Sequence, residues 1–456
     1  MITIGKYNVL GMLGRGGMGK VLRVEVPIIR RIAALKLLDP REPLIALLGM
    51  ETLRKRFMAE AIAMAGIRHP YICQVLDYGE DRGRPFYLMD YFCNNLGLVM
   101  GETYDPEAPS RPLPIDKAVA YTRQILSGLA RLHHAGMIHR DIKPFNILLT
   151  ERDEVKICDF GLSKVRGERF AVPATLKVGT PCYAAPEQTV NPDAVDEAAD
   201  LFSVGVIFYR MLSGRLPGIP LEPASRWNMD LDDGWDRLLS RMLARDPKAR
   251  FSSASTVIEE LDRLFGNWSD TMKTICRISA DGARPAQSRI RDRPRSRPIK
   301  TGHRQNRSRL GVDRHWRPLT YTVNRWKNRG ADAIEDLSTG LLWQSNGTPY
   351  PVNWHDAEAA VARLNADGFA GRTRWRLPTV DELLTLLAPV PRGTDYCLEP
   401  VFPRGQRRLW SCDRRAFTTA WYVSLDGGFV NWHDMACRLH AKAVCGPERQ
   451  TKRSGP

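Results

Sequence analysis

The chain has 456 residues, too many for one compact core, because single domains usually run to about 100–200 residues. Hydrophobic residues make up 43% and charged residues 26%, which excludes a fibrous or wholly disordered protein. The formal net charge is +16, but residues 284–330 carry +13 of it, so the rest of the chain is nearly neutral.

Nothing in the sequence predicts a membrane span. No apolar run approaches the ~20 residues that a membrane-crossing helix needs, and no secretory signal is visible at the start. The nine cysteines include no C-x-x-C pair, which argues against a zinc ribbon. We therefore expect a cytoplasmic protein without a membrane span.

Residues 1–266 alternate strand-like runs with helical patterns, and the first notable feature is a glycine-rich turn. It follows the strand-like run 7–13 and contains Gly14, Gly16 and Gly19. Glycine lets backbone N–H groups close over phosphates where a Cβ would intrude. The surrounding sequence excludes two other phosphate-binding sites. A Rossmann site needs a helix after the glycines, but residues 21–26 continue as a strand, and a Walker site needs Gly-Lys-Ser/Thr, which is absent here. For the glycines alone, an ordinary hairpin remains an alternative.

Two charged residues then stand on apolar backgrounds. Lys36 ends the run Ala-Ala-Leu-Lys, and a lysine buried in a strand needs an anion beside it. The helical pattern of residues 52–66 offers Glu60 as that anion. Taken singly, an edge lysine and a solvent-facing glutamate are the alternatives.

The decisive cluster is His-Arg-Asp-Ile-Lys-Pro-Phe-Asn at residues 139–146, followed by Asp-Phe-Gly at 159–161. With these motifs in this order, the chain resembles the eukaryotic-type serine/threonine protein kinases. Residues 179–187 match the end of the family's activation segment, and its structural anchors match Glu187, Asp200 and Arg250. The resemblance implies an α+β bilobal protein-kinase fold over residues 1–266, with a β-rich N-lobe and an α-rich C-lobe.

The same resemblance implies a role for each catalytic position. Such kinases transfer the γ-phosphate of ATP to protein hydroxyls, mainly by positioning groups and neutralising charge. Lys36, paired with Glu60, would hold the α- and β-phosphates of ATP. Asp141 would orient the substrate hydroxyl and accept its proton, and Lys143 would neutralise charge near the γ-phosphate.

The resemblance also implies the sites for metal and adenine. Asn146 and Asp159 would supply the oxygen ligands that Mg²⁺, or Mn²⁺ in its place, prefers. Apolar side chains would enclose the adenine, and the backbone of the lobe connection would pair with its edge. These residues are Val21, Ala34, Met89 and Leu148 for packing, and Asp90 and Phe92 for pairing.

No catalytic position of the family is missing, so an active enzyme with protein substrates is favoured over a degenerate one. The alternative is a kinase-shaped scaffold or binding protein whose purpose is to present the C-terminal domain. Intact Asp141, Asn146 and Asp159 argue against that alternative.

Residues 267–330 are rich in Arg, Ser and Pro and poor in aliphatic side chains, so they predict a disordered basic linker without a core. Clustered arginines could instead bind nucleic acid, with Trp316, Tyr321 and Trp326 stacking on bases. We favour a solvated, self-repelling tether, or the basic lead-in strand of the next domain, over the nucleic-acid interpretation.

Residues 331–446 change character, with six tryptophans among short strand-like runs, and residues 447–456 form a tail. The runs 336–343 and 375–383 resemble the Lcl C-terminal domain family, also called DUF1566. This resemblance implies a small α+β domain of C-type-lectin-like fold that binds an unknown ligand.

One internal repeat lies in this zone, because Val-Asn-Trp-His-Asp occurs at residues 352–356 and again at 430–434. The two copies could bring histidines and aspartates around a metal: His355, Asp356, His433 and Asp434. The pattern of Asn353 followed three residues later by Asp356 favours a helix cap instead.

The resemblance also generates a prediction about regulation. Arg140, beside Asp141, would need an anion in the active state, and a phosphate on the activation segment would supply it. Three hydroxyls are candidates: Ser163, Thr175 and Thr180. Because Thr180 fits a structural and substrate-positioning role, we expect autophosphorylation at Thr175, with Ser163 second. Mass spectrometry of ATP-treated protein checks this, and a fully active enzyme bare at both sites would contradict it.

Overall fold

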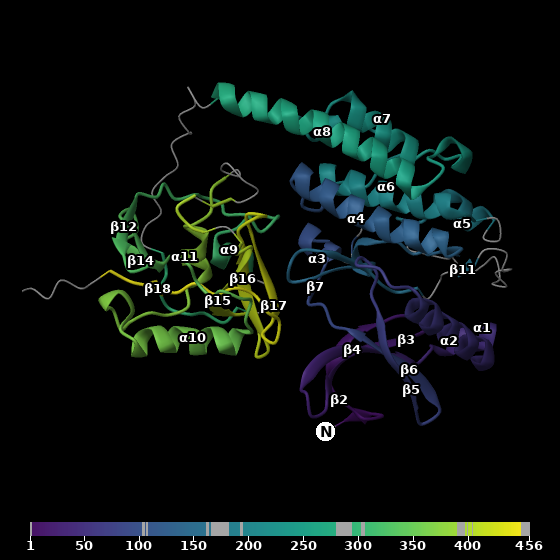
Figure 1. Ribbon diagram of the computed structural model, residues 1–456, viewed down its shortest axis with the longest axis horizontal. Helices are drawn as coiled ribbons and strands as arrows, with labels where there is room; N and C mark the ends of the chain where they lie inside the picture. The colour runs from purple at the N-terminus through teal and green to yellow at the C-terminus, as the bar shows by residue number, and fades with distance from the viewer. Residues whose placement is uncertain are drawn as a thin grey trace, which may run out of the picture. The chain divides into compact units, whose positions relative to one another are not determined.

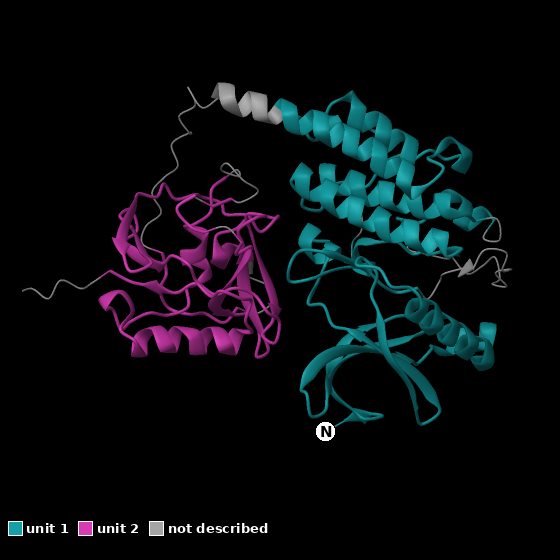
Figure 2. Cartoon of the chain, viewed as in Figure 1, with its two compact units in different colours: residues 1–278 teal, residues 279–456 magenta. Residues whose placement is uncertain are grey.

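The computed structural model describes most of the chain. The described residues are 2–102, 105, 108–160, 164–165, 182–191, 195–279, 294–301, 306–389, 397–398, 400–403 and 405–447. The chain divides into two compact units, residues 1–278 and 279–456 (Figure 2).

The first part of unit 1 is a six-stranded sheet with the order β1-β2-β3-β4-β6-β5, in which every neighbouring pair is antiparallel (Figure 1). Its strands are β1 (Thr3–Ile4), β2 (Tyr7–Arg15), β3 (Gly19–Val26), β4 (Arg31–Leu38), β5 (Val75–Asp81) and β6 (Arg84–Asp90). Two helices lie between β4 and β5: α1 (Glu42–Leu48) and α2 (Met50–Gly66).

The alternation of β4 determines where Lys36 lies. Successive side chains of a strand point to opposite faces. Leu35 and Leu37 pack into one apolar cluster of the sheet, whereas Ala34 and Leu38 pack into another that includes side chains of α2. Lys36 shares the second face and is buried among them.

Helix α2 turns one stripe of side chains toward the core. Its buried residues follow the helical period: Leu53, Phe57, Glu60, Ala61 and Met64. Glu60 therefore lies on the buried stripe, and the alternative of a solvent-facing glutamate is wrong. The preceding helix α1 buries no residue.

The second part of unit 1 is mainly helical (Figure 1). Its helices are α3 (Leu96–Met100), α4 (Ile115–His134), α5 (Pro186–Val190), α6 (Glu197–Ser213), α7 (Asp233–Met242) and α8 (Ala254–Ser279). Its short strands are β7 (Asn94–Asn95), β8 (Met137–Ile138), β9 (Ile147–Leu149), β10 (Val155–Ile157) and β11 (Lys164–Val165). Helix α6 is buried on nearly every side because its sequence is apolar almost throughout.

Unit 2 contains two antiparallel sheets, with orders β12-β13-β14-β18 and β15-β16-β17. The strands are β12 (Trp326–Gly330), β13 (Ala333–Asp336), β14 (Leu341–Gln344), β15 (Arg408–Arg414), β16 (Thr419–Ser424), β17 (Phe429–Asp434) and β18 (Val444–Cys445). The helices are α9 (Asn306–Leu310), α10 (Trp354–Ala366) and α11 (Val380–Leu384). Their apolar faces form one core that includes Trp343 and Trp421.

The basic segment differs from the expected disordered linker. Residues 267–279 continue helix α8, and residues 294–301 and 306–330 pack into unit 2. Leu310 and Val312 are buried in its core. Arg295 forms two hydrogen bonds with the buried carboxylate of Asp413, at 2.9 and 2.8 Å. Composition misled here, because a few apolar side chains and one paired arginine anchor a stretch that is mostly polar.

The aromatic side chains of this segment also have core partners. Trp316 lies against Trp421, with ring centroids 5.3 Å apart, and Trp326 lies edge-on to Phe402 at 5.2 Å. Trp421 donates its indole N–H to the hydroxyl of Thr301, at 2.9 Å. These packed rings are not free to stack on bases, so the nucleic-acid alternative loses its main support.

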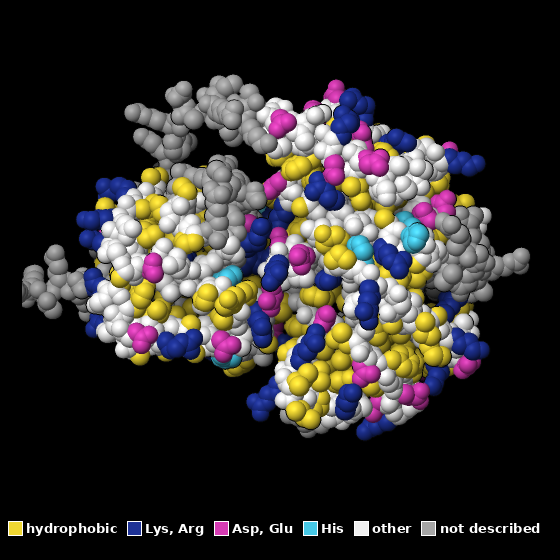
Figure 3. Space-filling model, in the orientation of Figure 1, with side chains coloured by type: hydrophobic (Ala, Val, Ile, Leu, Met, Phe, Trp, Pro, Cys, Tyr) yellow, Lys and Arg dark blue, Asp and Glu magenta, His cyan; other side chains and the backbone are white. Residues whose placement is uncertain are grey.

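Charged side chains of both signs are interspersed over the face of unit 1 in Figure 3, while hydrophobic side chains gather over its sheet. Within the described residues, no helix is both long and apolar enough to cross a membrane.

The anchoring of the basic segment can be tested at Asp413. Replacing it by Ala leaves Arg295 and the backbone N–H groups of Ile299 and Val380 without their acceptor. We expect unit 2 to lose about 3–5 kcal/mol of stability, because breaking a buried ion pair exposes the remaining charge to an apolar interior. Urea-dependent hydrogen exchange of residues 408–434 measures this loss.

The control is Glu335→Ala, which removes the partner of the more exposed Arg329. It should cost no more than about 1 kcal/mol. Equal effects of the two variants would contradict the anchoring role of Asp413.

Candidate active site

Lys36 lies between two carboxylates from different elements. Its Nζ donates to Glu60 Oε1 of α2 at 2.7 Å and to Asp159 Oδ1, which follows β10, at 2.8 Å. The structure therefore brings together the strand lysine, the helix glutamate and the aspartate of the Asp-Phe-Gly motif. The sequence predicted the pairing of the lysine with the glutamate and assigned the aspartate to the metal.

The charges in this cluster shift one another's pKa values. Burial alone would lower the pKa of Lys36, but the charges of Asp159 and Glu60 raise it well above its usual value. The charge of Lys36 lowers the pKa of Asp159 to about 2, although the 45% exposure of that side chain screens part of the effect. Burial raises the pKa of Glu60 against the opposing charge of Lys36. Lys36 thus stays a cation at neutral pH.

The 139–146 loop forms a second group of side chains around Asp141. Asp141 Oδ2 accepts from Lys143 Nζ at 2.7 Å and from Asn146 Nδ2 at 3.1 Å. The charge of Lys143 also contributes to lowering the pKa of Asp159, so the two groups belong to one electrostatic site.

Buried Asp200, on helix α6, holds this loop in place. Its carboxylate accepts from the backbone N–H groups of His139 and Arg140, at 2.9 and 2.8 Å, and it contacts His133 Nε2 at 2.9 Å. These bonds support Arg140 in a left-handed backbone conformation, with φ of 69°. An acid in the core of the helical half therefore fixes the conformation immediately before Asp141.

The apolar residues expected around adenine all belong to the main core of unit 1 or pack against it. Ala34 and Met89 are buried in the main core of unit 1, and Val21 and Leu148 pack against it partly exposed. Of the three glycines expected in the turn, Gly19 cannot be replaced by a larger residue without a steric clash. An added Cβ there would lie 2.1 Å from the carbonyl oxygen of Leu37. An added Cβ on Gly14 or Gly16 would meet nothing within 4 Å, so both leave the turn open to a ligand.

Asp159 and Asn146 fit a hard divalent cation. The Asn146 amide nitrogen donates to Asp141, which directs the amide oxygen elsewhere, and the Asp159 carboxylate is partly exposed. Mg²⁺ commonly takes one or two protein oxygens and completes its shell with waters and substrate phosphates. No cluster of three or more metal-binding His, Cys, Asp or Glu side chains occurs in the part of the chain that the structure describes.

The activation-segment residues Ser163, Thr175 and Thr180 lie outside the described residues. The end of the segment is described, and Glu187 there forms a two-pronged ion pair with Arg250, with N–O distances of 2.6 and 2.8 Å. The Arg250 side chain is fully buried, so this pair fixes the start of α5 to the helical half.

One residue of the site was missed by sequence reasoning. Tyr87 of β6 donates its hydroxyl to Glu60 Oε1 at 3.0 Å, and Lys36 Nζ lies 5.7 Å from its ring centre. Tyr87 is also the cross-strand partner of Lys36. Its position two residues before Met89 could have suggested that it shares the face of the site.

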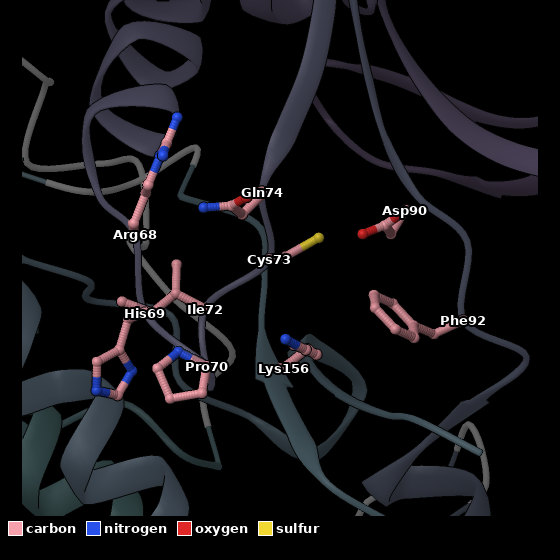
Figure 4. Close-up of a pocket in the computed structure, with 9 residues that line it drawn as sticks. All are labelled: Arg68, His69, Pro70, Ile72, Cys73, Gln74, Asp90, Phe92 and Lys156. Atoms are coloured by element: carbon pink, nitrogen blue, oxygen red, sulfur yellow. The ribbon is translucent and has the colours of Figure 1, made fainter. Parts of the chain in front are cut away.

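A pocket of about 420 Å³ lies beside the connection between the two halves of unit 1 (Figure 4). The side chains of Asp90 and Phe92 line it, together with Arg68, His69, Pro70, Ile72, Cys73, Gln74 and Lys156. Lys36, Asp141, Asn146 and Asp159 do not line this pocket, whereas Asp90 and Phe92, whose backbone is expected beside the adenine, do.

The repeat of unit 2 does not form a metal centre in the described structure. His355 is mostly exposed, whereas His433 is buried and stacked on Tyr422, and burial lowers its pKa to about 3. Asn353 caps helix α10 by accepting from the backbone N–H of Asp356 at 2.9 Å. The predicted helix cap is confirmed.

Comparison with known proteins agrees with this geometry. The model of the protein kinase domain family matches residues 7–261, more than half of the chain, and the chain therefore belongs to that family. The model of the Lcl C-terminal domain matches residues 332–445. Both resemblances inferred from the motifs, and with them the kinase fold, are confirmed.

Three curated relatives illustrate the similarity. Serine/threonine-protein kinase PksC of Streptomyces coelicolor is 34% identical, and the match covers 58% of this chain and 50% of PksC. PknL of Mycobacterium tuberculosis is 32% identical over 57% of this chain and 65% of its own length. Pkn1 of Myxococcus xanthus is 31% identical over 90% of this chain and 60% of Pkn1, so the similarity extends into unit 2. This chain spans about half the length of PksC.

The ion-pair cluster predicts how a lysine variant behaves. Lys36→Met should destabilise unit 1 by about 3–5 kcal/mol, because Glu60 would keep a buried charge without its cation. Adding Glu60→Gln should recover part of that stability, since a neutral amide is less costly to bury. Urea unfolding of the single and double variants measures both effects. A double variant less stable than Lys36→Met would contradict this account.

Proposed function

We propose that this chain is a serine/threonine protein kinase that transfers the γ-phosphate of ATP to hydroxyl groups of proteins and autophosphorylates its activation segment. The observation that carries the proposal is the pairing of Lys36 with both Glu60 and Asp159, in the same unit as the Asp141–Lys143–Asn146 group. Family membership and the named kinases among its relatives support it.

The charged residues of the site would have different roles in the transfer. Lys36, kept cationic by its two carboxylates, would bind the α- and β-phosphates of ATP. The Asp141 carboxylate would accept a hydrogen bond from the substrate hydroxyl and take its proton as the γ-phosphoryl group is transferred. Lys143, already beside Asp141, would offset the negative charge that the phosphoryl group carries.

Asn146 and Asp159 would hold Mg²⁺, with Mn²⁺ as a possible replacement. When bound, the cation supplies charge neutralisation at the phosphate oxygens. The adenine would lie among Val21, Ala34, Met89 and Leu148, and the backbone of Asp90 and Phe92 would pair with its edge. The turn that contains Gly14, Gly16 and Gly19 would close over the phosphates.

The competing function is a kinase-shaped scaffold that presents unit 2. A scaffold needs no buried cation and no polar group around Asp141, and both are costly to build into an interior. Their presence favours the enzyme. We further propose that unit 2 is the recognition module, and that the requirement for ATP places the kinase unit in the cytoplasm, where its protein substrates would be.

The test compares phosphate transfer from labelled ATP, in the presence of Mg²⁺, by the wild type and by Asp141→Asn. We expect the variant to lose about 10²- to 10⁴-fold in rate, because an amide cannot accept the proton. A stability measurement on both proteins shows whether the variant is folded.

The matched control is Asp262→Asn, an exposed aspartate of α8 that pairs with Arg123. Its labelling should equal that of the wild type. Undiminished incorporation by Asp141→Asn would remove the catalytic assignment of that residue.

A further inference from the structure

We propose that a surface of unit 2 binds phosphorylated serine and threonine side chains of proteins, the product of the proposed kinase activity, on which this inference rests. We call this surface the cation patch. It consists of Lys300 and Arg414 with the aromatic rings beside which they lie, Phe417 and Trp354.

Two cations of the patch face each other across a backbone bridge. Lys300 and Arg414 are paired in parallel, because Thr301 N donates to Arg414 O and Arg414 N donates to Ile299 O, both at 3.0 Å. Bridged residues place their side chains on the same face, with backbones ~5 Å apart. Ile299 packs toward the core and Asp413 is buried, so their neighbours Lys300 and Arg414 turn outward.

Like charges at facing positions destabilise a sheet unless an anion lies between them. In the described structure, neither Lys300 nor Arg414 forms an ion pair with an acidic side chain. Lys300 Nζ instead lies 3.3 Å from the ring centre of Phe417, and the Arg414 guanidinium lies 4.5 Å from that of Trp354. Phe417 is 85% exposed, so the charge beside it is open to solvent. The aromatic rings order the cations without neutralising them.

The internal repeat supplies one of these rings. Trp354 belongs to the first copy of Val-Asn-Trp-His-Asp and Trp432 to the second. Arg414 lies over the first tryptophan, and the next residue, Arg415, lies over the second at 3.6 Å. Each copy of the repeat therefore places a tryptophan ring beside one of two consecutive arginines, and the tryptophan of the first copy orders the arginine of the cation patch.

The chemistry of the patch fits a single phosphate better than a nucleic acid. A phosphorylated side chain carries a charge of about −1.5 to −2 and three acceptor oxygens, which match a guanidinium beside an ammonium. Phe417 offers an apolar contact for a residue that flanks the phosphate.

The experiment measures binding of fluorescein-labelled peptides to the full chain by fluorescence anisotropy. One peptide library carries phosphothreonine at a fixed position between degenerate flanks, and a second carries threonine there. We expect binding of the first alone, and a loss of at least ~10-fold in Lys300→Glu and in Arg414→Glu, since each removes a charge-assisted contact. Arg374→Glu, a charge-matched change of an exposed arginine preceding Trp375, should bind as the wild type does. Equal binding of the two libraries, or equal losses in all three variants, would overturn the proposal.

Stability separates this role from a structural one. Lys300→Glu places an acid opposite Arg414, so its unfolding temperature should equal or exceed that of the wild type even as phosphopeptide binding is lost. A fall in stability that accompanies the loss of binding would overturn the assignment. Lys300→Gln removes the charge without adding a new one and should also weaken binding at wild-type stability.

Two further measurements distinguish the alternatives. Single-stranded RNA should compete poorly with the phosphothreonine library, and RNA binding that the library cannot displace would replace our proposal with a nucleic-acid site. Lys300→Glu should transfer phosphate from labelled ATP as the wild type does. Because the peptides are synthesised already phosphorylated, failure of the kinase proposal would show in ATP labelling, and failure of this one would show in anisotropy.

Discussion

The ammonium group of Lys36 remains charged in the interior because Glu60 and Asp159 each bring a carboxylate to it. This requirement ties three separate parts of unit 1 together: strand β4, helix α2 and the residues after β10. Displacing α2 would leave charges without partners on both sides, which is expensive in an apolar surrounding. The position of α2 is therefore coupled electrostatically to the state of the site.

A second buried acid, Asp200, holds the loop before Asp141 in place in the helical half. Asp200 uses its carboxylate to hold the backbone at His139 and Arg140, so the conformation before Asp141 is set from the core of α6 rather than by the loop itself. The residues proposed for catalysis thus lie on elements fixed by buried contacts. The turn at Gly14 and Gly16 leaves space for a ligand. This arrangement matches what phosphoryl transfer requires, namely charges held in place before the substrate arrives.

Much of the candidate site could be predicted because its residue types are constrained by chemistry. Lys36 and Glu60 sit in strand and helix patterns that fix which face they occupy, and ordered motifs identified the loop around Asp141. Tyr87 was missed because a tyrosine in an apolar strand is ordinarily a packing residue. The basic segment was misjudged for a different reason. Leu310, Val312 and Arg295 gain their partners only from strands far along the chain, and local composition does not reveal such contacts.

The packing of the basic segment also bears on how unit 2 can be isolated. A fragment beginning at residue 331 would lack β12, leaving strand β13 as an open sheet edge available to other chains. It would also uncover the ring of Trp421 and remove the oxygen that accepts its indole hydrogen. Such a fragment should self-associate, so a binding partner recovered with it could reflect the exposed edge rather than the native surface.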